Sequence, residues 1–156
     1  MKKIKRGDLL LIKSKFDPVG CLIRFLTNSQ FNHVAWILDS NHIIDYHYGI
    51  VIRSINKYLN KNFYEIKIVR IKKIKKQQLN KAIEILLRTR KKISYFKLIL
   101  TFILLYFKYE GTLPKNTCSG SIAKVLYKVG FKFNNKKPIL ITPEDINKSI
   151  KVREIK

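Results

Sequence analysis

Apolar residues in the first half of the chain form short runs with the length and residue types of β-strands. DLLLI, at 8–12, follows the turn residue Gly7, and HVAWIL, at 33–38, is rich in β-branched and aromatic residues. HIIDYHY and GIVIRSI come next, on either side of Gly49, and FYEIKIVRIKKI at 63–74 alternates apolar and polar side chains. These runs predict strands, and the segment 33–55 is predicted to form a β meander.

A helical spacing of apolar residues marks two further segments. Asp17 and Pro18 are typical of a helix cap and a first helical position, and the spacing after them predicts a helix to about Asn28. A second helix is predicted from Gln77 to the basic cluster RTRKK. The apolar segment ISYFKLILTFILLYF, at 93–107, is shorter than the ~20 residues that span a bilayer. We expect a buried central helix there, with insertion into a membrane surface as the alternative.

The length and composition predict a single folded domain over residues 1–156. The chain has 156 residues, of which 46% are hydrophobic, so it can bury a core, and it contains no linker or repeat. Two cysteines exclude a scaffold built from disulfides. The apolar run near the start is too short for a signal peptide, so we expect a protein that is cytoplasmic as synthesised. The Lys-rich composition also suits a protein encoded by a phage or virus.

The net charge of +23 predicts attraction to polyanions, because 33 Lys and Arg residues face 10 Asp and Glu residues. An anionic membrane, an anionic cell-wall polymer and nucleic acid are the candidate partners. Most of the basic residues are Lys, whereas phosphate and base recognition depends more on the planar fork of Arg. Nucleic acid is therefore the less favoured partner, and solvated Lys faces account for much of the charge.

The candidate catalytic residues centre on Cys118, which is predicted to be the first residue of a helix. The segment KNTCSGSIAKVLYKVG has a cap at Asn116 or Thr117 and ends at Gly130. The amides and the dipole at a helix start stabilise a thiolate. His33 opens the strand 33–38 and shares a strand face with Ala35 and Ile37; if that face meets the Cys118 helix, a Cys–His pair forms. Asp45, on the next strand, is placed to orient the imidazole as a hairpin partner opposite His33.

Other residues compete for these roles. Cys21 also lies in the first turn of a predicted helix, but its apolar neighbours indicate a buried, structural thiol. His47 lies two residues after Asp45 and is the alternative third group of the site. His42 and His47 could ligate a metal together with His33 and a cysteine, but their spacing matches no compact metal site. We therefore expect no metal or cofactor.

Two segments together resemble the NlpC-type papain-like cysteine hydrolases. TCSGSIAKVLYKVG is similar to the helix that carries the family's nucleophile, and HVAWILDSNHIID is similar to the block that carries its histidine. The histidine block comes first here, which is the circularly permuted order of the YiiX-like branch and of the relatives of lecithin retinol acyltransferase. GDLLLI, NSQFNHVAW, GIVIRSINKYL and ITPEDINKS also fit the permuted pattern. Thr117 and Asp45 depart from the residues common in the family.

The resemblance implies an α+β fold in which an antiparallel sheet packs against the helix of the nucleophilic cysteine. It also implies acyl transfer by Cys118, His33 and Asp45 without a cofactor. The substrate implied first is a cell-wall peptide, cleaved by a peptidase or amidase; the alternative is a lipid acyl group, hydrolysed or transferred at an anionic membrane. A second alternative, from the charge, is a non-catalytic basic module that binds nucleic acid or membrane.

Overall fold

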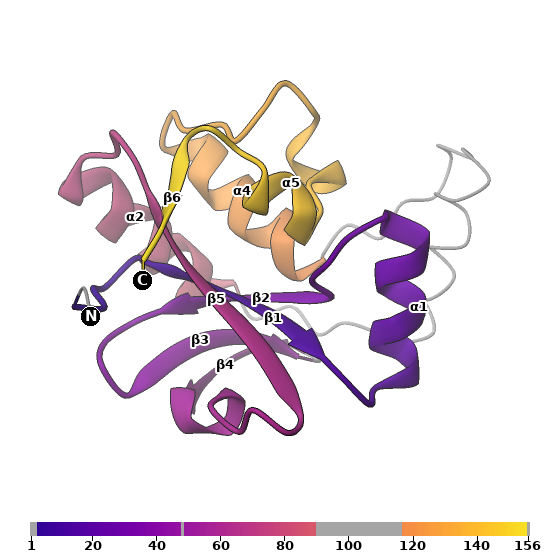
Figure 1. Cartoon of the computed structure of the whole chain (residues 1–156). Coiled ribbons are helices and arrows are strands. Elements are labelled where there is room, and N and C mark those ends of the chain that lie inside the picture. The colour runs from indigo at the N-terminus through magenta and orange to yellow at the C-terminus, as the bar shows by residue number, and fades with distance from the viewer. Residues whose placement is uncertain (1–2, 48, 90–116, 156) are drawn as a thin grey trace.

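The structure is a computed structural model that describes residues 3–47, 49–89 and 117–155. Its strands form one sheet of six in the order β4-β3-β2-β1-β5-β6, and every neighbouring pair is antiparallel. The expected α+β class with an antiparallel sheet is confirmed (Figure 1). The strands are β1 (Leu9–Ser14), β2 (His33–Ile37), β3 (His42–His47), β4 (Gly49–Ser54), β5 (Tyr64–Ile71) and β6 (Val152–Glu154).

Helices occupy both the connections between strands and the second half of the described chain. They are α1 (Pro18–Thr27), α2 (Lys76–Arg88), α4 (Cys118–Lys128) and α5 (Pro143–Asn147), with the 3-10 turns η1 (Ile55–Tyr58) and η3 (Pro138–Leu140). Among the described residues, no helix combines the length and the apolar character needed to cross a membrane. The predicted helix at 93–107 lies outside the described residues.

The two faces of the sheet bury two separate hydrophobic clusters, because successive side chains of a strand point to opposite sides. On one face, strand residues such as Leu11, Val34 and Trp36 pack against α2, α4 and α5. On the other face, Ala35 and Ile37 pack in a smaller cluster that η1 covers. The smaller cluster consists of Leu10, Ile12, Ala35, Ile37, Ile43, Ile55 and Tyr58.

Most of the predicted elements are confirmed. The strand at 8–12, the β meander and the strand at 63–74 correspond to β1, to β2 through β4 and to β5. The Asp17 carboxylate accepts a hydrogen bond from the Val19 N–H, and Asn28 ends α1 in the left-handed conformation at φ 45°. The short edge strand β6 was not predicted, since three residues carry too little of an alternating pattern.

The helix that Cys118 opens has the predicted boundaries. Thr117 is its N-cap, and the Thr117 hydroxyl accepts a hydrogen bond from the Gly120 N–H at 2.9 Å. The helix ends at Lys128, and Gly130 follows at φ 84°, a conformation that favours glycine. Cys118 therefore occupies the first helical position of α4, where the backbone amides have no partner within the helix.

Candidate active site

The three side chains predicted to form a catalytic site are in contact. His33, the first residue of β2, lies with its Nε2 atom 2.6 Å from Oδ1 of Asp45 on β3. His33 and Cys118 lie close enough for their charges and a side-chain hydrogen bond between them to shift the pKa of both groups. Because Asp45 engages Nε2, Nδ1 is the ring nitrogen that faces the thiol. Cys118, His33 and Asp45 thus form one connected chain from sulfur to carboxylate.

The helix α4 reaches His33 from a direction that the sequence did not predict. It packs on the sheet face of Val34 and Trp36, whereas Ala35 and Ile37 face the other cluster, so the expectation that the face of Ala35 meets the Cys118 helix is wrong. His33 is the first residue of β2, at the end of the strand where the pairing with β3 has already stopped. The Cys118 sulfur accepts hydrogen bonds from the backbone N–H groups of Val34 and Ser119.

The end of the β2–β3 ladder leaves room for the sulfur. The paired register runs through Ile37–Ile43 and ends at Trp36–Ile44. Along an antiparallel pair, every second residue directs its backbone N–H toward the partner strand. Beyond Trp36, the next N–H that points from β2 toward β3 is that of Val34. That N–H binds the Cys118 sulfur. Continuing the register places Asp45 opposite Ala35, so Asp45 is the diagonal neighbour of His33 and lies two residues away from the predicted opposite position.

Asp45 is fully buried and is held by two further side chains that sequence reasoning missed. The Tyr58 hydroxyl donates to Oδ2 of Asp45 at 2.9 Å, and Arg53 Nε lies 3.3 Å from the same oxygen. Val51 pairs with Asp45 across β3 and β4, so Arg53, two residues on, shares the face of Asp45. That alternation was visible in the sequence for Arg53, but the contact of Tyr58 depends on the turn of η1.

The electrostatics favour an ionised site. Burial opposes the charge on His33, but Cys118 and Asp45 outweigh burial and raise the pKa of the imidazole to about 10. Burial also opposes a thiolate, yet the charge of His33 and the N–H donors of Val34 and Ser119 lower the pKa of the Cys118 thiol. Burial would raise the pKa of Asp45, but hydrogen bonds from His33 and Tyr58 hold it below its usual range. The thiolate, the imidazolium and the carboxylate therefore stabilise one another's charged forms.

The residues that follow Cys118 in the CSG motif have structural reasons for their identity. The Ser119 hydroxyl donates to the backbone oxygen of Ile141 at 2.6 Å, which ties the first turn of α4 to the segment before α5. A Cβ atom at Gly120 would lie 2.6 Å from Oγ1 of Thr117 and 3.1 Å from the oxygen of Ile139. Because glycine has no Cβ atom, it allows both the Thr117 cap of α4 and the close approach of η3.

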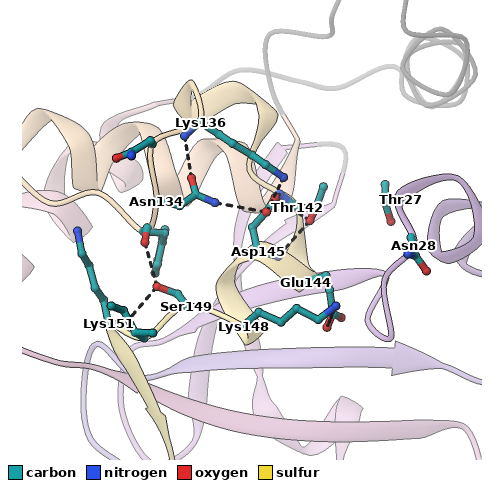
Figure 2. A pocket seen from close by; sticks show the side chains of 13 residues that line it. Thr27, Asn28, Asn134, Lys136, Thr142, Glu144, Asp145, Lys148, Ser149 and Lys151 are labelled. Atoms are coloured by element: carbon teal, nitrogen blue, oxygen red, sulfur yellow. Dashed lines mark hydrogen bonds and ion pairs between the residues drawn. The ribbon is translucent and has the colours of Figure 1, made fainter.

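Glu144 fixes the loop that leads into His33. Its buried carboxylate accepts a hydrogen bond from the Gln30 N–H at 2.9 Å and lies 3.5 Å from the Ser29 hydroxyl. Asn147 also contacts the carboxylate, at 3.1 Å. Lys148, drawn beside Glu144 in Figure 2, lies 3.6 Å from it. Glu144 belongs to the segment ITPEDINKS, so the resemblance covered it, but no sequence signal connected it to residues 29–31. This contact joins α5 to the loop before the histidine.

A polar pocket of about 590 Å³ lies beside Glu144, between α5, the turn after Phe133 and the end of α1. Figure 2 shows Asp145 at its centre, in contact with Lys136, Asn134 and Thr142. Lys136 Nζ lies 2.6 Å from Oδ1 of Asp145. The charges that line the pocket largely neutralise one another, and Cys118, His33 and Asp45 are not among its lining residues.

The remaining candidates lie apart from this site or outside what the structure describes. Cys21 is exposed and accepts a hydrogen bond from Arg24, so the prediction of a buried thiol is wrong. His42 lies at the far end of the β2–β3 hairpin beside Asp39. The backbone of His47 ends β3, but its side chain is not described. In the described part of the chain, no three His, Cys, Asp or Glu side chains gather as metal ligands would.

Comparison of the sequence with models of known protein families and with curated proteins finds no family model and no curated protein that matches.

Proposed function

We propose that this protein is a cysteine hydrolase that cleaves an amide or acyl bond with Cys118, His33 and Asp45. The observation that carries the proposal is the contact chain from the Cys118 sulfur through His33 to Asp45, at the first position of a helix. The residue types, their order and the antiparallel sheet also agree with the permuted papain-like fold that the sequence resembles. We propose that fold for this chain.

The chemistry follows from the ionised site. The Cys118 thiolate attacks the carbonyl carbon of the substrate, forming a carbon–sulfur bond while the carbonyl electrons move to oxygen. The His33 imidazolium gives its proton to the leaving nitrogen or oxygen, and a thioester results. His33 then takes a proton from water, whose oxygen displaces the sulfur. Asp45 keeps the imidazole oriented and stabilises its charged form throughout.

The start of α4 supplies a place for the negative oxygen of the tetrahedral intermediate. The backbone N–H groups of Gly120 and Ser121 already bind Thr117, and that of Ser119 binds the sulfur. The N–H of Cys118 is the first amide of the helix, and we assign it to the oxyanion.

For the substrate we propose a cell-wall peptide amide first, because the sequence resembles the NlpC-type hydrolases. An acyl lipid is the second substrate class. Incubation of the protein with purified cell wall and, separately, with phospholipid, followed by mass spectrometry of the products, distinguishes the two classes. Cys118→Ala is the control, since cleavage by that variant as well would contradict the proposal for either substrate.

A reactive-thiol test does not depend on the substrate. An acyl electrophile should label Cys118 in the Cys21→Ala variant at nearly the wild-type rate and should label Cys118→Ala very little. The control is necessary because Cys21 is exposed and any thiol reagent can reach it. An inert Cys118, together with DNA binding that weakens strongly as salt rises, would favour a basic binding module over an enzyme.

A further inference from the structure

Two phenylalanine side chains that lie far apart in the sequence form an exposed pair at one end of the sheet. Phe16, in the connection between β1 and α1, is 76% exposed, and Phe63, just before β5, is 53% exposed. Their rings meet edge to face with centroids 6.3 Å apart. The Lys15 N–H donates to the Phe63 oxygen at 2.9 Å, so the pairing of β1 with β5 holds the two rings together.

Three lysines lie close to this pair along the chain, since Lys15 precedes Phe16, and Lys57 and Lys61 lie on the segment that leads to Phe63. Lys15 Nζ binds the backbone oxygen of Lys61 at 2.7 Å, and Lys57 lies over the ring of Tyr58. In the described part of the chain, Lys15, Lys57 and Lys61 form no ion pair with a carboxylate. The nearby acidic groups are already engaged: Asp17 caps α1 and Glu65 pairs with Lys13. The surface around the two rings is therefore both apolar and positive.

The segment 57–63, which carries Lys57, Lys61 and Phe63, also touches the candidate active site. Leu59, 48% exposed, follows Tyr58, whose hydroxyl binds Asp45 and whose ring centroid lies 6.4 Å from that of His33. Figure 1 shows the turn between β1 and α1 and the start of β5 at the same end of the sheet. We name the set Phe16, Phe63, Leu59, Lys15, Lys57 and Lys61 the aromatic–lysine surface.

We propose that the aromatic–lysine surface docks the protein on an anionic lipid bilayer. Exposed aromatic and aliphatic side chains enter the boundary between headgroups and acyl chains, and lysines around them are attracted to anionic headgroups. The net charge of +23 adds long-range attraction to such a surface. A folded surface of this kind needs both parts, because a single apolar pair gives weak binding and a charge ring alone gives binding that salt abolishes.

Vesicle sedimentation tests the docking. The full chain is mixed with vesicles of phosphatidylcholine alone, or of phosphatidylcholine and phosphatidylglycerol in equal parts. Wild type should bind the anionic vesicles, and Phe16→Ser with Phe63→Ser should weaken that binding by about tenfold or more. Ile150→Ser is the matched control, because Ile150 is 86% exposed but lies near the polar pocket, away from the surface. Its binding should stay within about twofold of wild type.

Several outcomes would overturn the proposal. The proposal is overturned if wild type does not bind anionic vesicles. It is also overturned if the double Phe variant remains folded and binds like wild type. Equal losses in the double Phe variant and in Ile150→Ser would indicate adsorption without a specific surface. Self-association of wild type that the double Phe variant abolishes, without vesicle binding, would assign the surface to a second copy of the chain. Unchanged binding by Lys15→Gln with Lys61→Gln would also contradict the electrostatic half of the proposal.

These experiments distinguish a failure of the proposed docking from a failure of the proposed catalysis. Cys118→Ala should bind vesicles as wild type does, because the thiol is not part of the aromatic–lysine surface. Loss of thiol reactivity with intact vesicle binding would therefore count against the proposed hydrolase alone. Loss of vesicle binding with an intact reactive thiol would count against the docking surface alone.

Discussion

The hydroxyl of Tyr58 donates a hydrogen bond to Oδ2 of the buried Asp45 at 2.9 Å, on the side of the carboxylate away from His33. Tyr58 thus helps to keep a charge in a place where burial disfavours it. Burial and the neighbouring Asp45 carboxylate together raise the pKa of the Tyr58 hydroxyl well above its usual range, so Tyr58 remains a donor at every pH of interest. The relationship predicts that Tyr58 supports the site without touching a substrate.

Tyr58→Phe should therefore lower both stability and thiol reactivity. A hydrogen bond to a buried charged group contributes roughly 1.5 to 3 kcal/mol, and that is the expected loss in the free energy of unfolding. Labelling of Cys118 by an acyl electrophile should slow by about tenfold, because Asp45 holds its charge and orientation less well. Denaturant unfolding and labelling kinetics measure the two effects.

Tyr64→Phe is the control for that prediction. The ring of Tyr64 packs edge-on against Tyr58 with centroids 5.1 Å apart, so the variant perturbs the same aromatic neighbourhood while leaving the Tyr58–Asp45 hydrogen bond in place. It should change neither quantity substantially. Equal effects of the two variants would show that the loss of any hydroxyl from this cluster, rather than of the hydrogen bond to Asp45, accounts for the change.

Asp45→Asn tests the third member of the site. The amide keeps the shape of the side chain but removes the charge that favours the imidazolium of His33, so the pKa of His33 should fall. We expect labelling of Cys118 to slow by about 10- to 100-fold, roughly 1.4 to 2.7 kcal/mol of barrier, because the thiolate and the imidazolium also stabilise each other. His33→Ala should slow labelling more.

His47→Ala separates Asp45 from its competitor. The contact of Asp45 with His33 at 2.6 Å leads us to expect little change in the labelling rate of His47→Ala. An unchanged rate and pH profile for Asp45→Asn, beside a large loss for His47→Ala, would remove Asp45 from the site and put His47 in its place.

Glu144 should matter because it anchors the loop before His33. Glu144→Ala leaves the Gln30 N–H without its acceptor and should cost about 1 to 3 kcal/mol of unfolding free energy. Glu144→Gln retains an acceptor oxygen, so it should recover most of the stability and of the Cys118 labelling rate. Thermal and denaturant unfolding, together with labelling, measure this.

Glu65→Ala serves as the control for Glu144. Glu65 forms an exposed ion pair with Lys13 on β1, and solvent screens such a pair, so Glu65→Ala should change the stability very little. A loss for Glu144→Ala no larger than that for Glu65→Ala would contradict the anchoring role.

The sequence predicted the parts of this molecule that depend on local patterns. Alternation marked the strands, Asp17 and Thr117 marked helix starts, and the placement of Cys118 at a helix start followed from the cap. The order of the motifs also identified His33 and Asp45 as candidate site residues before any contact between them was known. These features are encoded within a few residues of one another, where spacing and residue type are informative.

The features that the sequence did not predict depend on packing between distant segments. The packing of the whole core decides which face of the sheet α4 covers. The prediction that the face of Ala35 meets the Cys118 helix was therefore wrong. Cys21 has apolar neighbours in the sequence, but α1 turns it outward. The contacts of Tyr58 with Asp45 and of Glu144 with Gln30 join segments whose approach no local pattern records.

The rate of Cys118 alkylation as a function of pH tests the ionised site most directly. It is measured in the Cys21→Ala variant, so that Cys118 is the thiol that reports. Because the pKa of Cys118 is lowered and that of His33 is raised to about 10, the rate should rise at a pH below the range of an ordinary thiol and then change little until the pH approaches about 10. His33→Ala should move the rise toward the range of an ordinary thiol, near pH 8.5. A rate in the parent variant that rises through one step near that ordinary value, unchanged by His33→Ala, would contradict the thiolate–imidazolium pair and the proposed hydrolase with it.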